Sequence, residues 1–119
     1  MIPKYNLWLE SRGEVLLSVW RVKLLESIEE MGSITSAAAV MGVPYRRAWQ
    51  RLREMEERLG VPLVTTEVGG VGGGGAKLTS EAKDLVQRFH RFAGGFEDEI
   101  HERFENAFGE DWISLDNEN

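Results

Sequence analysis

The sequence predicts a mainly α-helical fold with a small β-hairpin: a winged helix-turn-helix followed by an extended C-terminal helix. Three observations predict it. Two short helical segments flank a tight turn that contains glycine. Two strand-like segments then flank a glycine tract, and a long apolar stripe at helical spacing follows them. The expected boundaries are 1–79 for the winged helix-turn-helix (helix-turn-helix about 33–59, wing about 62–79), 80–108 for one or more C-terminal helices, and 109–119 for an acidic tail.

The first part of the chain predicts a strand and then a helix. Residues 5–9 are expected to form a short strand, although the turn signal Ser11-Arg12-Gly13 leaves open a hairpin that continues through Val15. From about Ser18 the apolar residues change to a helical period, and this helix is expected to end at Gly32. Its apolar face carries Trp20, Leu24, Leu25, Ile28 and Met31.

Two helices follow in quick succession. Ser33 is expected to cap a helix from Ile34 to Met41, because a serine oxygen can accept from a free backbone N–H of the first turn. After a turn at Gly42, Pro44 suits the first turn of a third helix, which is expected to end at about Leu59. Its apolar positions are Tyr45, Ala48, Leu52, Met55 and Leu59, and the small residues Ala37, Ala38 and Ala48 allow the two helices to pack closely.

The wing and the C-terminal helices complete the prediction. Strands at about 63–68 and 76–78 flank the glycine tract 69–75, and Thr79 or Ser80 is expected to cap the next helix. The Gly94-Gly95 pair is expected to bend or end that helix. An apolar stripe runs through this part of the chain, formed by Leu85, Phe89, Phe92, Phe96, Ile100, Phe104 and Phe108.

Composition restricts the possible classes of protein. The 119 residues fit one domain, and the absence of cysteine excludes disulfides and thiolate metal sites. With no long apolar run and no signal-peptide pattern, we expect no membrane segment and a cytoplasmic location. The net charge of −6 argues against DNA as a partner. However, residues 97–119 hold nine acids and one base, a balance of −8, which leaves +2 for residues 1–96.

The predicted third helix carries the chemistry of DNA recognition. On the face opposite its apolar positions stand Arg46, Arg47, Gln50 and Arg51, and the acids Glu54, Glu56 and Glu57 come afterwards. Arginine can donate two hydrogen bonds to a guanine edge, and glutamine can pair with adenine. The alternative interpretation is an ordinary solvated helix face, but the preceding helix and glycine turn favour DNA. We expect Trp49 to pack beside Ala48 rather than to lie near the DNA backbone.

Other candidate sites are weaker. Gly70, Gly72 and Gly75 match the spacing of a dinucleotide-binding loop, but the required strand-helix-strand unit is missing, so no cofactor is expected. The tract suits a wing whose main-chain N–H groups approach DNA phosphates, and Lys77 and Thr79 would then also contact the DNA backbone. The alternative is a hairpin tip that contacts nothing. His90 and His101 lack a third ligand in register, so we expect no metal site, and no catalytic constellation indicates an enzyme.

Several of these segments together resemble the N-terminal domain of the ModE family, molybdate-responsive transcription regulators of bacteria and archaea. The resemblance covers roughly residues 18–92, and its most specific part is the glycine-rich tract ending in Ala-Lys-Leu-Thr. The segment Leu59-Gly60-Val61-Pro62-Leu63 is also similar to LysR-type regulators. The residues that carry the resemblance are Gly32-Ser33-Ile34, Ala37-Ala38, Gly42-Val43, Tyr45, Ala48-Trp49 and the stretch from Gly69 to Thr79.

The resemblance implies a homodimer that binds a palindromic operator in double-stranded DNA. The chain departs from the family at Pro44, where relatives often have serine, and it ends soon after the last helix, so molybdate binding within this chain is not expected. The apolar stripe from Leu85 to Phe104 is the expected dimer seam, and the alternative is that it belongs to the core of a single chain. The expected DNA contacts are Ser33, Thr35, Pro44, Tyr45, Arg46, Arg47, Gln50, Arg51, Lys77 and Thr79.

Two other functions stay open at this point. The acidic C-terminal segment would also suit a protein-interaction module that has kept the winged-helix fold, since negative charge repels phosphate. A regulator that depends on a separate effector-binding partner is the other alternative. The sequence favours a sequence-specific regulator of the ModE type over both.

Overall fold

The computed structural model describes residues 1–67 and 74–109. It begins with a hairpin of β1 (Trp8–Ser11) and β2 (Glu14–Ser18). Arg12 and Gly13 form the two-residue loop with φ of 54° and 77°, the positive values that suit a tight hairpin turn. The strand expected at residues 5–9 is therefore displaced along the chain, and the hairpin through Val15 is the arrangement that forms.

The three helices of the helix-turn-helix region follow: α1 (Val19–Met31), α2 (Ile34–Met41) and α3 (Tyr45–Leu59). Ser33 caps α2 as predicted, since its Oγ accepts from the Ser36 N–H at 2.9 Å. Pro44 was expected inside the first turn of α3 but lies one residue before it. With φ of −62° and ψ of 146°, Pro44 is extended and serves as the N-cap without a side-chain hydrogen bond.

The wing and the C-terminal helices complete the fold. The wing strands are β3 (Val64–Glu67) and β4 (Gly75–Leu78), which pair antiparallel with Val64 opposite Leu78 and Thr65 opposite Lys77. The helices α4 (Ser80–Ala93) and α5 (Phe96–Phe108) are separated at Gly94-Gly95, as predicted. The strand end at Val68, the tip of the glycine tract and the tail after Gly109 lie outside the described residues.

The core lies between α1, α2, α3, the wing and α4. Leu24, Leu25, Ile28, Met55 and Leu63 are fully buried there. Ala37, Ala38 and Ala48 are at most 2% exposed, which confirms the expected close packing of α2 against α3. The prediction for Tyr45 was wrong, because this residue is 49% exposed at the start of α3 instead of lying on its buried face.

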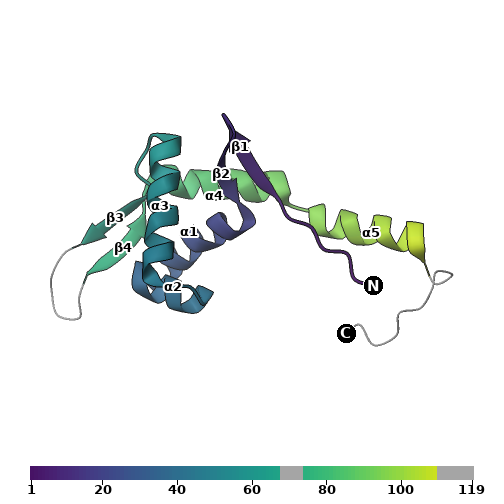
Figure 1. Ribbon diagram of the computed structural model, residues 1–119, viewed down its shortest axis with the longest axis horizontal. Helices are drawn as coiled ribbons and strands as arrows, with labels where there is room; N and C mark the ends of the chain where they lie inside the picture. Colours follow the sequence, from purple (N-terminus) through teal and green to yellow (C-terminus); the bar gives the residue numbers. More distant parts are fainter. Residues whose placement is uncertain (68–73, 110–119) are drawn as a thin grey trace.

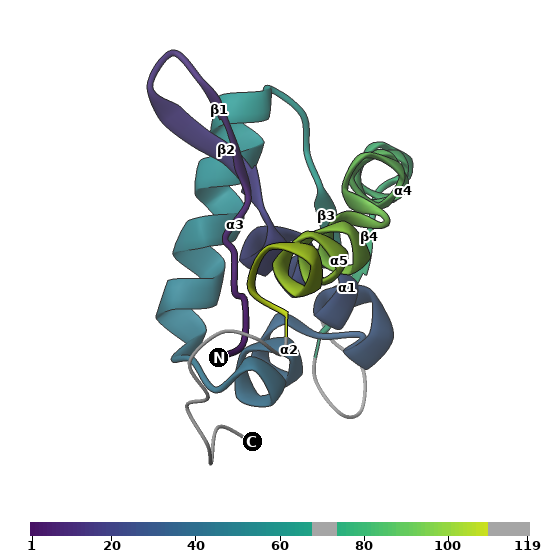
Figure 2. The ribbon, with the colours of Figure 1, turned by 90° about the vertical axis from the view of Figure 1, so that its right-hand side faces the viewer.

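The C-terminal end of the molecule is extended. α5 projects away from the body of the domain (Figure 1), and the view along its axis shows it beside the N-terminal segment (Figure 2). None of its residues is buried. Within residues 1–67 and 74–109, no helix combines the length and the apolar character needed to span a membrane.

Four hydrogen bonds fix the wing beside the helix-turn-helix. The Ala76 N–H donates to the carbonyl oxygen of Gly32 at 2.8 Å, and the Leu78 N–H donates to Oε2 of Glu29 at 2.9 Å. On the other strand, Oε2 of Glu56 accepts from the N–H groups of Leu63 and Val64 at 2.8 and 3.3 Å. The wing is therefore held from α1 on one side and from α3 on the other.

Candidate nucleic-acid interface

The first two turns of α3 present polar side chains away from the core. Arg46, Arg47 and Gln50 are exposed, whereas Ala48 on the opposite side of the helix is fully buried. Neither the Arg46 nor the Arg47 side chain forms an ion pair or hydrogen bond with another residue of the described ranges. These cations keep their donors available, as a helix that enters a DNA groove requires.

Arg51 differs from the other two arginines. Its Nη1 lies 3.0 and 3.1 Å from the two carboxylate oxygens of Glu54. Its carbonyl oxygen also accepts from Nη1 of the buried Arg21 at 3.3 Å. Arg51 can therefore contact a base edge only by sharing or leaving Glu54, a coupling that the sequence analysis missed.

Glu54 is the centre of a network of four charges. Its carboxylate lies 3.4 Å from Nη2 of Arg21 and 3.8 Å from Nη2 of Arg58, in addition to Arg51. Burial alone would raise the pKa of Glu54, but the positive charges of Arg51 and Arg21 outweigh it and lower the pKa of Glu54 overall. Burial lowers the pKa of Arg21, and the charge of Glu54 opposes that effect. Arginine nevertheless stays protonated in proteins.

Two of the acids in the second half of α3 have structural partners. Glu54 neutralises the buried guanidinium of Arg21, and Glu56 accepts from the backbone at the start of the wing. Arg58 joins the C-terminal part of α3 to the first hairpin, because its Nη1 donates to the Val15 carbonyl at 2.8 Å. These roles of Glu54 and Glu56 depend on contacts between elements, which the sequence pattern of α3 does not indicate.

The start of α2, the start of α3 and the base of the wing surround one hollow of about 140 Å³. Ser33, Thr35 and Tyr45 line it from the helices, and Thr66 and Glu67 line it from β3. The structure thus brings three of the predicted contact residues together. The Oγ of Ser33 is already an acceptor in the α2 cap, whereas Thr35 is exposed.

The two wing residues of the predicted set have different environments. Lys77 is exposed on β4, opposite Thr65. The hydroxyl of Thr79 accepts from the Ala82 N–H at 3.1 Å and donates to the Pro62 carbonyl at 2.9 Å. Thr79 therefore caps α4 and joins it to the segment that precedes β3, so its side chain is engaged within the protein.

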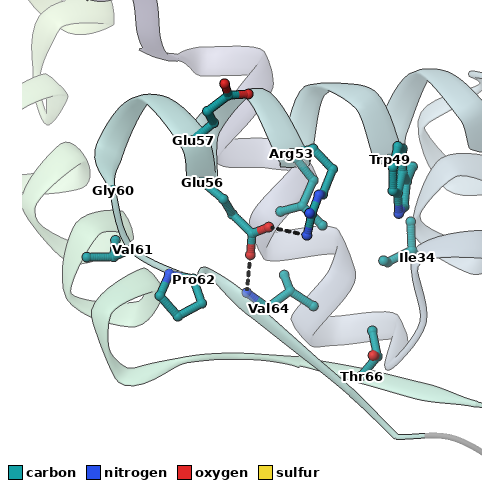
Figure 3. A pocket seen from close by; sticks show the side chains of 11 residues that line it. Ile34, Trp49, Arg53, Glu56, Glu57, Gly60, Val61, Pro62, Val64 and Thr66 are labelled. Carbon is teal, nitrogen blue, oxygen red and sulfur yellow. Dashed lines mark hydrogen bonds and ion pairs between the residues drawn. The ribbon is translucent and has the colours of Figure 1, made fainter.

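A larger groove of about 610 Å³ lies between α3 and β3 (Figure 3). Trp49 borders it and is 44% exposed, so the ring does not pack into the core beside Ala48 as expected. The guanidinium carbon of Arg53 lies 5.6 Å from the centroid of the Trp49 ring. Arg53 also contacts Glu56, with 3.5 Å between Nη1 and Oε1.

The apolar stripe proposed as a dimer seam divides into two parts. Phe89 is 5% exposed and belongs to the core of the protomer, and Leu85 packs against that core. Phe92 is 50% exposed, and its ring lies edge-on to Phe96 at 5.3 Å between centroids. Leu85 and Phe89 therefore contribute to the core of one protomer, and the dimer seam stays a prediction. The partly exposed part consists of Phe92, Phe96, Ile100 and Phe104.

Known proteins resemble this chain over its N-terminal part. The family described as "Bacterial regulatory helix-turn-helix protein, lysR family" matches residues 20–83. The chain is 39% identical over 91 residues to the molybdenum-pterin-binding protein MopB of Rhodobacter capsulatus, covering 71% of this chain and 34% of that protein. It is 35% identical over 98 residues to the molybdenum transport protein ModE of Azotobacter vinelandii, covering 80% and 36% respectively.

The structural comparison agrees on the fold. The DNA-binding domain of BenM in complex with benA site 1 DNA matches with a TM-score of 0.60 and 19% identity, covering 78% of this chain and 99% of that chain. The predicted winged helix-turn-helix is thereby confirmed, as is the resemblance to ModE regulators. The chain spans about a third of the length of the two relatives named above. Because the family match covers more than half of its residues, the chain belongs to the LysR family of bacterial regulatory helix-turn-helix proteins.

Proposed function

We propose that this chain is the DNA-reading part of a cytoplasmic transcription regulator, and that α3 enters the major groove of its operator. Arg46, Arg47 and Gln50 contact base edges, and Lys77 on β4 contacts a phosphate. Thr35 and Tyr45 lie at the starts of α2 and α3 beside the wing, and the sugar-phosphate backbone that flanks the major groove passes there. Arg51 contacts a base only when its ion pair with Glu54 opens.

The arrangement of charge on α3 carries this proposal. Arg46 and Arg47 lie on the exposed face of its first turns, and the described residues supply no acid to pair with them. Further along the helix, Glu54 and Glu56 are held by Arg21 and by the wing backbone. A positive, unpaired N-terminal half is the half that reaches the bases in a helix-turn-helix.

Replacement of the two unpaired arginines tests the proposal. For an operator recovered by selection, Arg46→Ala or Arg47→Ala should each weaken binding by about 1–3 kcal/mol where that residue contacts a base. Binding to a scrambled duplex should change less, because that binding depends mainly on phosphate contacts. Fluorescence anisotropy titrations measure both affinities.

The matched control is Arg88→Ala. Arg88 is an exposed arginine on α4, and its Nε lies 2.7 Å from Oδ2 of Asp84. Its replacement removes the same charge as the other two substitutions, but at a distance from α3. Its affinity for both duplexes should equal that of the wild type. Unchanged operator affinity in both the Arg46 and Arg47 variants would contradict the assignment of α3.

We further propose that two copies pair through the exposed part of the stripe. α5 buries none of its residues in the protomer, yet Phe96, Ile100 and Phe104 repeat at four-residue spacing along it. A second copy would remove this apolar surface from water and supply the two-fold symmetry of a palindromic operator. The supporting observation is that α5 has partly exposed apolar residues and few contacts of its own with the body.

The oligomeric state of a Phe104→Asp variant tests this pairing. Sedimentation equilibrium should give a dimer for the wild type and a monomer for the variant, because a buried unpaired carboxylate is costly in an apolar interface. Glu102→Gln, an exposed change on the same helix, should leave the dimer intact. A wild-type monomer at all accessible concentrations would contradict the pairing.

A further inference from the structure

The groove between α3 and β3 has unused hydrogen-bond donors at one end. Figure 3 shows the indole nitrogen of Trp49 and the hydroxyl of Thr66 on the same side of the groove as the side chain of Ile34. Neither polar group has a hydrogen-bond partner among the residues that the structure describes. An indole N–H can only donate, so its natural partner is an acceptor such as a phosphate oxygen.

Positive charge lies beside these donors. The Arg53 side chain is 63% exposed and stacks near the Trp49 ring, and its ion pair with Glu56 is long at 3.5 Å. Glu56 is 14% exposed, and its Oε2 already accepts from two backbone N–H groups of the wing. The charge of Glu56 is therefore compensated mainly within the protein, which leaves Arg53 able to interact with an anion.

The position of the groove relates it to the proposed DNA contacts. Ile34 and Thr66 border both this groove and the smaller hollow at the base of the wing, so the two hollows adjoin each other beside α3. When a helix occupies the major groove, the phosphodiester strand at the groove edge passes beside that helix. On the wing side of α3, this strand would meet the end of the groove that holds Trp49.

Resting on the function proposed above, we propose that the groove between α3 and β3 seats one phosphodiester strand of the operator at its Trp49 end. The Trp49 indole N–H and the Thr66 hydroxyl donate to phosphate oxygens, and Arg53 supplies positive charge. Glu57 lines the opposite end of the groove, where it repels phosphate. The strand therefore crosses the groove at the Trp49 end instead of following its whole length.

Three conservative variants isolate these contacts. Trp49→Phe keeps an aromatic ring beside Arg53 but removes the N–H donor. Thr66→Val keeps the shape and the strand preference of the side chain but removes the hydroxyl. Arg53→Gln removes the charge and keeps a polar side chain that can still bond Glu56.

The expected result is a loss of affinity that does not depend on sequence. Each variant should weaken binding to the selected operator and to a scrambled duplex by the same factor, about three- to tenfold. The ratio of the two affinities should stay at the wild-type value. In a salt series, Arg53→Gln should reduce the slope of log affinity against log salt by about 1, and Arg88→Gln should change neither quantity.

The outcomes separate this inference from the function on which it rests. If the wild type prefers the operator and Arg47→Ala abolishes that preference, while all three groove variants bind like the wild type, the groove assignment is wrong and α3 still reads bases. A loss confined to the operator would also overturn it, because the groove residues would then contact bases. If the wild type binds no duplex at low salt, both proposals fail. Unchanged urea unfolding of the three variants establishes that they fold.

Discussion

Glu54 decides how much positive charge α3 presents. It lies between the buried Arg21 and the partly exposed Arg51, with 3.4 and 3.0 Å to their nearest guanidinium nitrogens. A buried guanidinium without a partner is strongly unfavourable, so one carboxylate at this position is required by the core and not by DNA. Arg46 and Arg47, two turns earlier, have no such partner within the described residues.

A Glu54→Gln variant should be less stable and less sensitive to acid. The folded-state pKa of Glu54 is lowered, so this carboxylate stabilises the native state above its ordinary pKa of about 4.3. That contribution is lost as the pH falls through the folded-state value. Urea unfolding from pH 7 to pH 3 should show a smaller decline for the variant than for the wild type.

The control for this change is Glu57→Gln. Glu57 is exposed and has no polar partner within the part of the chain that the structure describes. Its unfolding profile should follow that of the wild type at every pH. Parallel wild-type and Glu54→Gln profiles would show that the network does not contribute as described.

At the scale of elements, Glu56 connects α3 to the wing. Its carboxylate accepts from two successive N–H groups, that of the fully buried Leu63 just before β3 and that of Val64, the first residue of β3. A carboxylate from the neighbouring helix thus satisfies two backbone donors where the chain enters the wing. On the other strand, Glu29 does the same for the Leu78 N–H.

Loss of the Glu56 carboxylate should therefore destabilise the protein. We expect Glu56→Ala to lower the free energy of unfolding by about 1.5–3 kcal/mol, because it leaves buried N–H groups without an acceptor. Glu56→Gln keeps an acceptor and should lose less. The neighbouring Glu57→Ala should stay within about 0.5 kcal/mol of the wild type. Equal stability of all three in urea unfolding would contradict the account of the wing.

The positions of helices and strands were predicted correctly where they depend on residues close together in the sequence. Ser33 followed by a glycine turn places α2 correctly, because a cap and a left-handed glycine act within a few residues. The first strand was misplaced because its position depends on the turn at Arg12-Gly13, which sets the register of the whole hairpin. Periodicity alone also put Tyr45 on the buried face of α3, although the core does not extend to that end of the helix.

The candidate site was predicted less completely than the fold. Arg46, Arg47 and Gln50 follow from their helical face, which a sequence shows directly. The ion pair between Arg51 and Glu54 is an i, i+3 contact that helical spacing could have indicated. The contact of Arg21 with the Arg51 carbonyl spans 30 residues of the chain, and no local pattern indicates it. Trp49 was expected in the core, because a large aromatic ring beside alanine usually packs inside. The open groove next to β3 instead leaves it half exposed.

At the scale of the whole molecule, the chain is elongated, with dimensions of 61 × 32 × 22 Å. The winged helix-turn-helix forms the compact part, and α5 projects from it with its apolar residues only partly covered (Figure 1). Gly95 makes this change of direction possible with a φ of 88°, a conformation that favours glycine. A second copy on α5 would place two α3 helices in a symmetric pair.

Selection of duplexes from a random pool, at low salt where electrostatic binding is strongest, tests the central claim most directly. The wild type should recover a palindrome whose half-sites lie about 10 base pairs apart or a multiple of that, as two symmetric helices require. The Arg46→Ala, Arg47→Ala double variant should recover no common motif. Failure of the wild type to enrich any sequence, or recovery of the same motif by the double variant, would contradict the assignment of α3 as the reading helix.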